Sequence, residues 1–153
     1  MHPDQPHFET LLTPALLLDA AKMMRNIRHL EDRATALGVT LRPHVKTAKS
    51  VEISKHLKDG TKTPITASTL AEAEAFHAAG HKDILYAVGI APQKLVRVPA
   101  LRDQGCDLVV ILDNLAQATV AAEAATPAMI EIDSDGHRGG LSPADPTLVE
   151  IGR

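Results

Sequence analysis

The chain has 153 residues, of which 44% are hydrophobic, 23% charged and only 2% aromatic, and its formal net charge is −3. This length suits one compact domain, and this composition is that of a globular protein with an aliphatic core. The Lys and Arg residues are spread along the chain and form no basic stripe, which argues against nucleic acid or an anionic membrane surface as a partner.

Cysteine content and apolar runs narrow the class further. Cys106 is the single cysteine, so an internal disulfide is excluded. It opens an apolar run, and we expect it to be a buried and unreactive thiol. No apolar run reaches the roughly 20 residues of a transmembrane helix, and residues 1–6 do not resemble a secretory signal. We therefore expect a cytoplasmic protein.

The first predicted elements are an arm, a strand and a helix. Residues 1–13 are polar and contain prolines, and we expect them to form an N-terminal arm. Residues 14–19 have the pattern of a short buried strand. In the next segment apolar side chains recur at three- and four-residue spacing, which predicts a helix that Gly38 ends. The side chains on that face are Met24, Ile27, Leu30, Ala34 and Leu37.

Beyond residue 38, predicted strands and helices alternate in units of roughly 20 to 25 residues. The predicted strands are 39–43, 64–67, 83–88, 107–112 and 128–132, and the predicted helices are 50–58, 69–79, 92–104, 114–125 and one that begins near 143. The strands lack polar-apolar alternation, which indicates a parallel sheet covered on both faces. An open doubly wound sheet and part of a (β/α)8 barrel both fit, although a complete barrel takes about 250 residues.

The strand ends are where side chains with a chemical role are expected in parallel α/β proteins. Residues 42–49 follow the predicted 39–43 strand and read Arg-Pro-His-Val-Lys-Thr-Ala-Lys. A lysine among cationic neighbours at such a position can be nucleophilic enough to form a Schiff base. On local chemistry alone, a solvated basic turn is the more common interpretation.

This segment resembles the lysine motif of the D-threonine aldolase and D-serine dehydratase family. That family has the alanine-racemase-like, type III fold of pyridoxal-phosphate (PLP) enzymes. Further segments resemble the family in the same order, and together the resemblance covers about residues 10–150. These segments are 13–19, Asn26 with Ile27, 66–74, 79–80, 83–85 and 131–140. Their order and spacing make the resemblance specific.

The resemblance implies roles for three residues. Lys46 would form the internal aldimine with PLP and then shuttle a proton at the substrate carbon. Arg138, after the fifth barrel strand, would face the phenolic oxygen of the cofactor. His44 would line the cofactor ring, with a histidine that only bonds to backbone as the alternative. Many members carry His where this chain has Ala48, so no role is assigned to that position.

The resemblance also implies a fold: the N-terminal part of an alanine-racemase-like, PLP-binding (β/α)8 barrel. Residues 1–13 would be the arm and residues 14–153 a truncated barrel domain, with the strand at 16–18 belonging to a second, β-rich domain. The later strands and the C-terminal domain, which carry the phosphate loops and divalent-metal ligands of relatives, are not expected here. A half barrel leaves unpaired edges and an open apolar interior, so we expect a poorly stable or self-associating chain, with a homodimer as the expected assembly.

The activity that the resemblance implies is that of a PLP-dependent lyase acting on D-amino acids, of the D-threonine aldolase or D-serine dehydratase type. An alanine-racemase-like racemase is the nearest alternative. A racemase typically needs a tyrosine as second base, and Tyr86 is predicted inside a strand, where it is a poor candidate. A non-catalytic PLP-binding protein and a ligand-free α/β module are the remaining alternatives.

The other ionisable groups are assigned structural roles. Asp133 and Asp135 lie close to His137 and could suggest a metal site. Short acidic residues in a glycine-containing turn more often bond to their own backbone, so no metal ligand is predicted. Four further histidines are expected to be surface or partly buried side chains, namely His29, His56, His77 and His81.

Overall fold

A computed structural model describes residues 10–153, so most of the predicted arm at 1–13 lies outside the described residues. The first half contains helix α1, helix α2, one 3-10 turn, strand β1 and helix α3, at Ala20–Leu37, Val51–Ser54, Gly60–Lys62, Ile65–Ala67 and Leu70–Ala78. The second half contains β2 (Asp83–Gly89), α4 (Pro92–Leu95), α5 (Val98–Asp103), β3 (Asp107–Leu112), α6 (Leu115–Glu123), β4 (Ala128–Ile130) and α7 (Thr147–Gly152).

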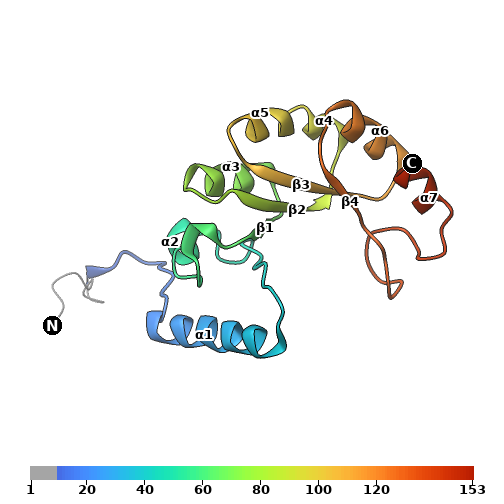
Figure 1. The fold of residues 1–153 in the computed structure, drawn as a ribbon. Coiled ribbons are helices and arrows are strands. Elements are labelled where there is room, and N and C mark those ends of the chain that lie inside the picture. The colour runs from blue at the N-terminus through green and yellow to red at the C-terminus, as the bar shows by residue number, and fades with distance from the viewer. Residues whose placement is uncertain (1–9) are drawn as a thin grey trace.

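The four strands form one parallel sheet in the sequential order β1-β2-β3-β4. Helices α3, α4, α5 and α6 all lie on one side of this sheet (Figure 1). A doubly wound sheet reverses its strand order and places helices on both faces, whereas a (β/α)8 barrel adds each strand beside the last with its helices outside. The sequential order and the one-sided helical layer therefore identify a barrel segment.

The core lies between the sheet and the helical layer. Alternate strand residues point into it, and the fully buried ones include Ile65, Ile84, Tyr86, Leu108 and Val110. They pack in one cluster with helix residues such as Phe76, Leu95, Val98 and Ala121.

The opposite face of the sheet is less covered than the expected cover on both faces. Leu85 and Val109 are half-buried there, and Met129 is 54% exposed.

Local signals explain where several helices begin and end. The Thr69 hydroxyl accepts a hydrogen bond from the Glu72 amide at 3.0 Å, and the Asn114 side chain accepts one from the Gln117 amide at 3.0 Å. Each bond satisfies an amide that the first helical turn leaves free. Gly38 ends α1 with a φ of 64°, a left-handed conformation that glycine adopts without steric cost. The predicted starts of the helices at residues 69 and 114 and the predicted end of α1 are therefore confirmed.

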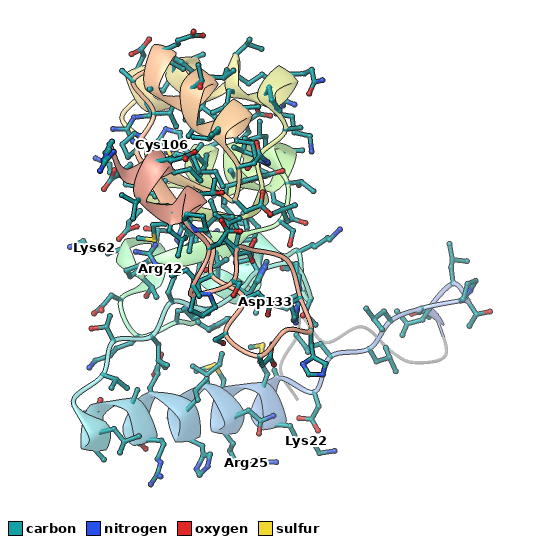
Figure 2. All side chains as sticks on the ribbon, turned by 90° about the vertical axis from the view of Figure 1, so that its right-hand side faces the viewer. Lys22, Arg25, Arg42, Lys62, Cys106 and Asp133 are labelled. Atoms are coloured by element: carbon teal, nitrogen blue, oxygen red, sulfur yellow. The ribbon has the colours of Figure 1, made fainter. Side chains whose placement is uncertain are left out.

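Helix α1 is the longest helix, and it stands apart from the layer formed by α3 to α6 (Figure 1). Its basic side chains Lys22 and Arg25 point away from the rest of the molecule (Figure 2). In the part of the chain that the structure describes, no helix combines the length and apolarity needed to cross a membrane.

Two predicted strands are wrong or reduced. Residues 14–19 form no strand, and Leu16, Leu17 and Leu18 are exposed, so the prediction that this run is a buried strand fails within the described chain. The strand predicted at 39–43 is reduced to a single bridge between His44 and Thr66, held by bonds from Val45 N to Thr66 O and from Thr66 N to Pro43 O. This segment has a neighbour on one side only, which is the weakest position for a strand.

Prolines and one serine account for the helices that differ from prediction. Pro99 lacks an amide proton, and the helix predicted over 92–104 is split into α4 and α5 just before it. The helix expected near residue 143 begins at Thr147, after Pro146 disfavours helical geometry at the preceding residue. Helix α2 stops at Ser54, whose hydroxyl donates to the Val51 carbonyl and so competes with the helical pattern.

Cys106 is a buried thiol, as predicted, with 2% of its surface exposed (labelled in Figure 2). Burial, reinforced by the nearby Asp107 carboxylate, raises its pKa to about 11. Because the thiolate is the reactive form, Cys106 is unreactive near neutral pH.

Candidate functional site

Lys46 lies in an exposed turn at the C-terminal end of the sheet. The turn covers residues 45–48 and follows the bridge that pairs His44 with Thr66 of β1. A hydrogen bond from the Lys49 amide to the Val45 carbonyl, 2.8 Å long, closes it. The Lys46 ammonium makes no hydrogen bond or ion pair with any residue in the range 10–153. Its amine is therefore available to a ligand.

His44 connects this turn to the next strand end. Its Nδ1 accepts a hydrogen bond from the Lys46 amide at 3.3 Å, and its Nε2 lies 3.2 Å from the Ser68 hydroxyl. Burial, and secondly the positive charge of Lys46, lower the pKa of the imidazole. The neutral ring with its proton on Nε2 fits both contacts. A histidine that bonds to backbone is thus observed, and its contact with a cofactor ring stays a prediction.

Glu72 lies behind the same turn, at the start of α3. Its carboxylate is 9% exposed; Oε2 accepts from the Ser68 amide at 2.8 Å, and Oε1 lies 3.4 Å from the Lys49 ammonium. Burial acts to raise the pKa of Glu72, but the Ser68 hydrogen bond and the Lys49 ammonium outweigh it and the pKa is lowered. The capping-box spacing indicated that Glu72 turns back toward the helix start, but not that it meets Lys49.

Arg42 has a structural role. Its guanidinium pairs with both carboxylate oxygens of Asp83 at 2.6 and 3.1 Å, and one of its nitrogens also donates to the Ile65 carbonyl at 3.4 Å. This arginine therefore ties the segment before His44 to the beginning of β1 and β2. In the basic segment at 42–49, Arg42 is therefore held in an ion pair, whereas Lys46 is exposed.

Arg138 lies in the loop that follows β4. The bridge between Ile132 and Leu141 closes the base of this loop with two 2.9 Å bonds, from Asp133 N to Leu141 O and from Leu141 N to Glu131 O. Figure 2 shows Asp133 in this loop, apart from the helical layer. Arg138 is exposed, and its guanidinium forms no bond with the described residues.

The Asp133 carboxylate organises the same loop. It accepts hydrogen bonds from the amides of Gly136, His137 and Arg138 at 3.0 to 3.3 Å. Desolvation acts to raise its pKa, but these bonds, led by the one from Arg138, lower it. This is the backbone-bonding role predicted for the acidic turn residues. No group of His, Cys, Asp or Glu side chains within residues 10–153 is arranged to hold a metal ion.

Lys46 and Arg138 both lie beyond the C-terminal end of the sheet. Lys46 lies beside β1, at one side of the sheet, and Arg138 follows β4, at the other side, and no bond joins them in the described structure. A free primary amine, a free guanidinium and a neutral imidazole form a donor set suited to an aldehyde with anionic oxygens. The side chains present therefore fit PLP, and they supply one portion of a site for it.

Tyr86 and His81 lie on the other side of the strands, away from this site. Tyr86 is fully buried in the core, and its hydroxyl accepts a hydrogen bond from Lys94 Nζ at 3.3 Å. The prediction that it is a poor catalytic base agrees with this position. His81 was expected at the surface or partly buried, and this was wrong because it is fully buried between Ser54 and Thr63. Of the other three histidines, His29 and His56 are exposed and His77 is partly buried, as predicted.

A cavity of about 510 Å³ lies elsewhere in the described chain, although its lining includes Pro43, the residue before His44. It lies between α1 and the segments leading into and out of α2, and its lining is mainly apolar, with Ile27, Leu30, Ala34, Leu41 and Leu57. Neither Lys46 nor Arg138 lines it. The candidate site is thus defined by the exposed strand-end side chains and not by this cavity.

Known proteins resemble the chain over most of its length. Residues 18–151 match the family model described as "Alanine racemase, N-terminal domain". The chain belongs to this family. D-threo-3-hydroxyaspartate dehydratase from Delftia sp. (strain HT23) is 48% identical over 151 residues, which are 94% of this chain and 40% of that enzyme. D-serine dehydratase from Dictyostelium discoideum is 31% identical over 94% of this chain and 40% of its own length.

Solved structures of the family agree with this membership. An Ala racemase-like protein from Idiomarina loihiensis superimposes with a TM-score of 0.87 and is 51% identical, over 93% of this chain and 40% of that protein. D-threonine aldolase from Filomicrobium marinum gives a TM-score of 0.80 at 28% identity, over 91% of this chain and 39% of that enzyme. The chain spans about 40% of the length of the relatives it matches. The predicted family and the predicted fold, the N-terminal part of an alanine-racemase-like barrel, are confirmed.

Proposed function

We propose that this protein is the PLP-binding, N-terminal part of a lyase that acts on D-amino acids, and that Lys46 binds the cofactor covalently through its side-chain amine. The observation that carries the proposal is the Lys46 ammonium, which follows the bridge of His44 to β1 and is unpaired among the described residues. The relatives that match it include dehydratases and an aldolase named for D-amino acids.

The neighbouring lysine supports the choice of Lys46. Lys49 is three residues away and also reaches solvent, but its ammonium lies 3.4 Å from the buried Glu72 carboxylate. An ammonium in an ion pair must lose that partner before it can act as a nucleophile, whereas Lys46 has no such partner among residues 10–153.

The remaining side chains would bind and orient. PLP, when bound, withdraws electrons from the substrate Cα and so eases the breaking of bonds to that carbon. We propose that the Lys46 amine moves the proton at Cα, while His44 holds the turn that carries Lys46. The Arg138 guanidinium would bind the phenolic oxygen of the cofactor and keep its ring oriented.

A divalent metal is part of the proposal for the complete active site. A variant of D-threo-3-hydroxyaspartate dehydratase has been solved in a form described as metal-free. The described residues of the present chain offer no cluster that could hold one. We propose that the metal ligands lie outside this chain.

Two alternatives remain distinct from a lyase. A PLP-binding protein without turnover would use the same Lys46 and Arg138. A racemase would need a second base, and Tyr86 does not serve because it is fully buried among core side chains and bonded to Lys94.

An assay on D-amino acids separates these activities. The protein is incubated with PLP, a divalent metal and D-threo-3-hydroxyaspartate, D-serine or D-threonine, with the L-enantiomers as controls. A lyase releases ammonia and a keto acid, or glycine and an aldehyde, from the D-forms only. Formation of the covalent adduct without turnover would indicate a binding protein, interconversion of enantiomers a racemase, and the absence of both adduct and turnover would overturn the proposal.

A further inference from the structure

The turn that carries Lys46 has few contacts of its own. Residues 46, 47, 48 and 49 are all exposed, and the backbone bonds that hold the turn are those of Val45 to Thr66 and of Lys49 to Val45. A segment with so few packing contacts would sample many conformations unless side chains fix it. Two side-chain contacts reach it: the imidazole of His44, just before the turn, and the carboxylate of Glu72, in the first turn of α3.

Glu72 is buried more deeply than a helix start requires. With 9% of its surface exposed, its Oε2 already accepts the Ser68 amide, and this contact alone would complete the cap. Its Oε1 is buried and accepts no hydrogen bond from a described group, so the Lys49 ammonium, 3.4 Å away, is its ion-pair partner. A buried carboxylate without a counter-charge is strongly unfavourable, so Glu72 holds Lys49 in place.

The backbone at Lys49 shows the same constraint. Its φ is 48°, in the left-handed region that side chains other than glycine, asparagine and aspartate rarely adopt. This conformation turns the chain from the Lys46 turn into the N-cap of α2, where the Ser50 hydroxyl accepts from the Ile53 amide at 3.3 Å. Residues in such conformations persist where their surroundings fix them.

We propose that Glu72 and Lys49 form a positioning pair that fixes the Lys46 turn and reserves Lys46 as the amine that meets the cofactor. The inference rests on the proposed function for its second half, the choice between the two amines. Its first half, the order of the turn, concerns the protein without any ligand. Neither residue is assigned a contact with substrate.

Three variants and one control test the pair. Glu72→Gln keeps an acceptor for the Ser68 amide but removes the charge, and Lys49→Asn removes the ammonium while keeping a residue that tolerates a positive φ. Lys49→Arg restores the cation. Glu74→Gln is the matched control, because Glu74 lies on the same helix and pairs with Arg97 at 2.6 and 2.8 Å, away from the turn.

Hydrogen exchange of the amides at residues 46–49, measured without PLP, tests the order of the turn. We expect exchange about fivefold faster in Glu72→Gln and Lys49→Asn, and unchanged in Lys49→Arg and Glu74→Gln. Lys49→Asn should have the larger effect, since it leaves a buried carboxylate unpaired. Equal exchange in all five proteins would overturn the pair, whatever the protein does with PLP.

Borohydride reduction with PLP, followed by peptide mapping, tests the choice of amine. The wild-type chain and Glu74→Gln should be labelled at Lys46, and Glu72→Gln at both Lys46 and Lys49, because the second ammonium is then free. Labelling confined to Lys46 in Glu72→Gln would overturn the claim that the pair reserves Lys46. No labelling of wild-type Lys46 would instead overturn the proposed function, while the exchange result would still decide whether the pair orders the turn.

Discussion

The imidazole of His44 accepts a hydrogen bond from the backbone amide of Lys46, with 3.3 Å between Nδ1 and the amide nitrogen. The residue proposed to bind the cofactor is therefore oriented by a titratable group two positions earlier in the chain. The other ring nitrogen, Nε2, lies 3.2 Å from the Ser68 hydroxyl. The hydrogen bond from the Lys46 amide to Nδ1 therefore requires a neutral imidazole.

This contact predicts a pH dependence in the Lys46 turn. Burial and the Lys46 charge lower the pKa of His44, so the ring is neutral at pH 7 and becomes protonated only below its usual value of 6.5. Protonation places a hydrogen on Nδ1, which then cannot accept from the Lys46 amide. We expect the NMR signal of that amide to shift as the pH falls from 7 through the region below 6.5, and not to shift in His44→Asn, whose side-chain oxygen remains an acceptor. A matching titration in His44→Asn would show that another group is responsible.

The loop that presents Arg138 depends on Gly140. A Cβ at this position would lie 2.9 Å from the Glu131 carbonyl oxygen and 2.9 Å from the Asp133 nitrogen, and the φ of Gly140 is 112°. We expect Gly140→Ala to lower the free energy of unfolding by about 2 to 3 kcal/mol and to expose the amide of Leu141 to exchange. Gly136→Ala is the control, because Gly136 has a φ of 73° but no atom within 4 Å of the added Cβ, and about 1 kcal/mol is expected there. Equal losses would mean that the close approach to Glu131 is not what matters.

His81 predicts a loss of stability in mild acid. The ring is fully buried, and its nitrogens lie 2.9 Å from the Ser54 hydroxyl and 3.3 Å from the Thr63 carbonyl. Burial lowers its pKa in the folded chain below 6.5, so below that pH the unfolded chain binds more protons and the free energy of unfolding falls.

We therefore expect the urea midpoint of the wild-type chain to fall between pH 7 and pH 5, and to fall less in His81→Gln. His56→Gln, which changes an exposed histidine, should keep the wild-type slope. His81→Gln is also expected to be less stable at pH 7, by about 2 to 3 kcal/mol, because the buried contacts are lost. A wild-type slope in His81→Gln would assign the acid sensitivity elsewhere.

The less covered face of the sheet predicts self-association. Met129 is 54% exposed on the side of the sheet opposite the helical layer, and β4, the last strand of the sheet, is paired with a strand on one edge only within the described chain. We expect the sedimentation coefficient to rise with concentration in the wild-type chain and to rise less in Met129→Lys. Val96→Lys, which changes a 76% exposed side chain in the helical layer, is the control. A monomer at all concentrations with a sharp melting transition would contradict this.

Much of the fold followed from local signals in the sequence. The β3 strand was predicted with the bounds it has in the structure, because the unbroken apolar run at 108–112 lies between Asp107 and Asp113 and leaves little choice of bounds. The caps at Thr69 and Asn114 are also local features, because each capping hydrogen bond joins residues three positions apart.

The features that sequence analysis missed depend on contacts between distant residues. His81 is buried because Ser54, 27 residues earlier, and Thr63, 18 residues earlier, meet it in the fold. The sequence indicates only that Glu72 lies in the first turn of a helix. Its ion pair with Lys49 depends on the turn at 45–48 and helix α3 lying side by side. The run at 16–18 has the residue pattern of a buried strand, but a strand needs a partner, and the described chain supplies none to it.

Peptide mapping after reduction of the PLP-treated wild-type chain with borohydride tests the central claim most directly. If Lys46 binds PLP covalently, we expect a visible absorbance band on addition of PLP, loss of that band on reduction, and a single labelled peptide that contains Lys46. The Lys46→Ala variant should lose both the band and the label. Labelling spread over surface lysines such as Lys22 and Lys62, or no band at all, would contradict it.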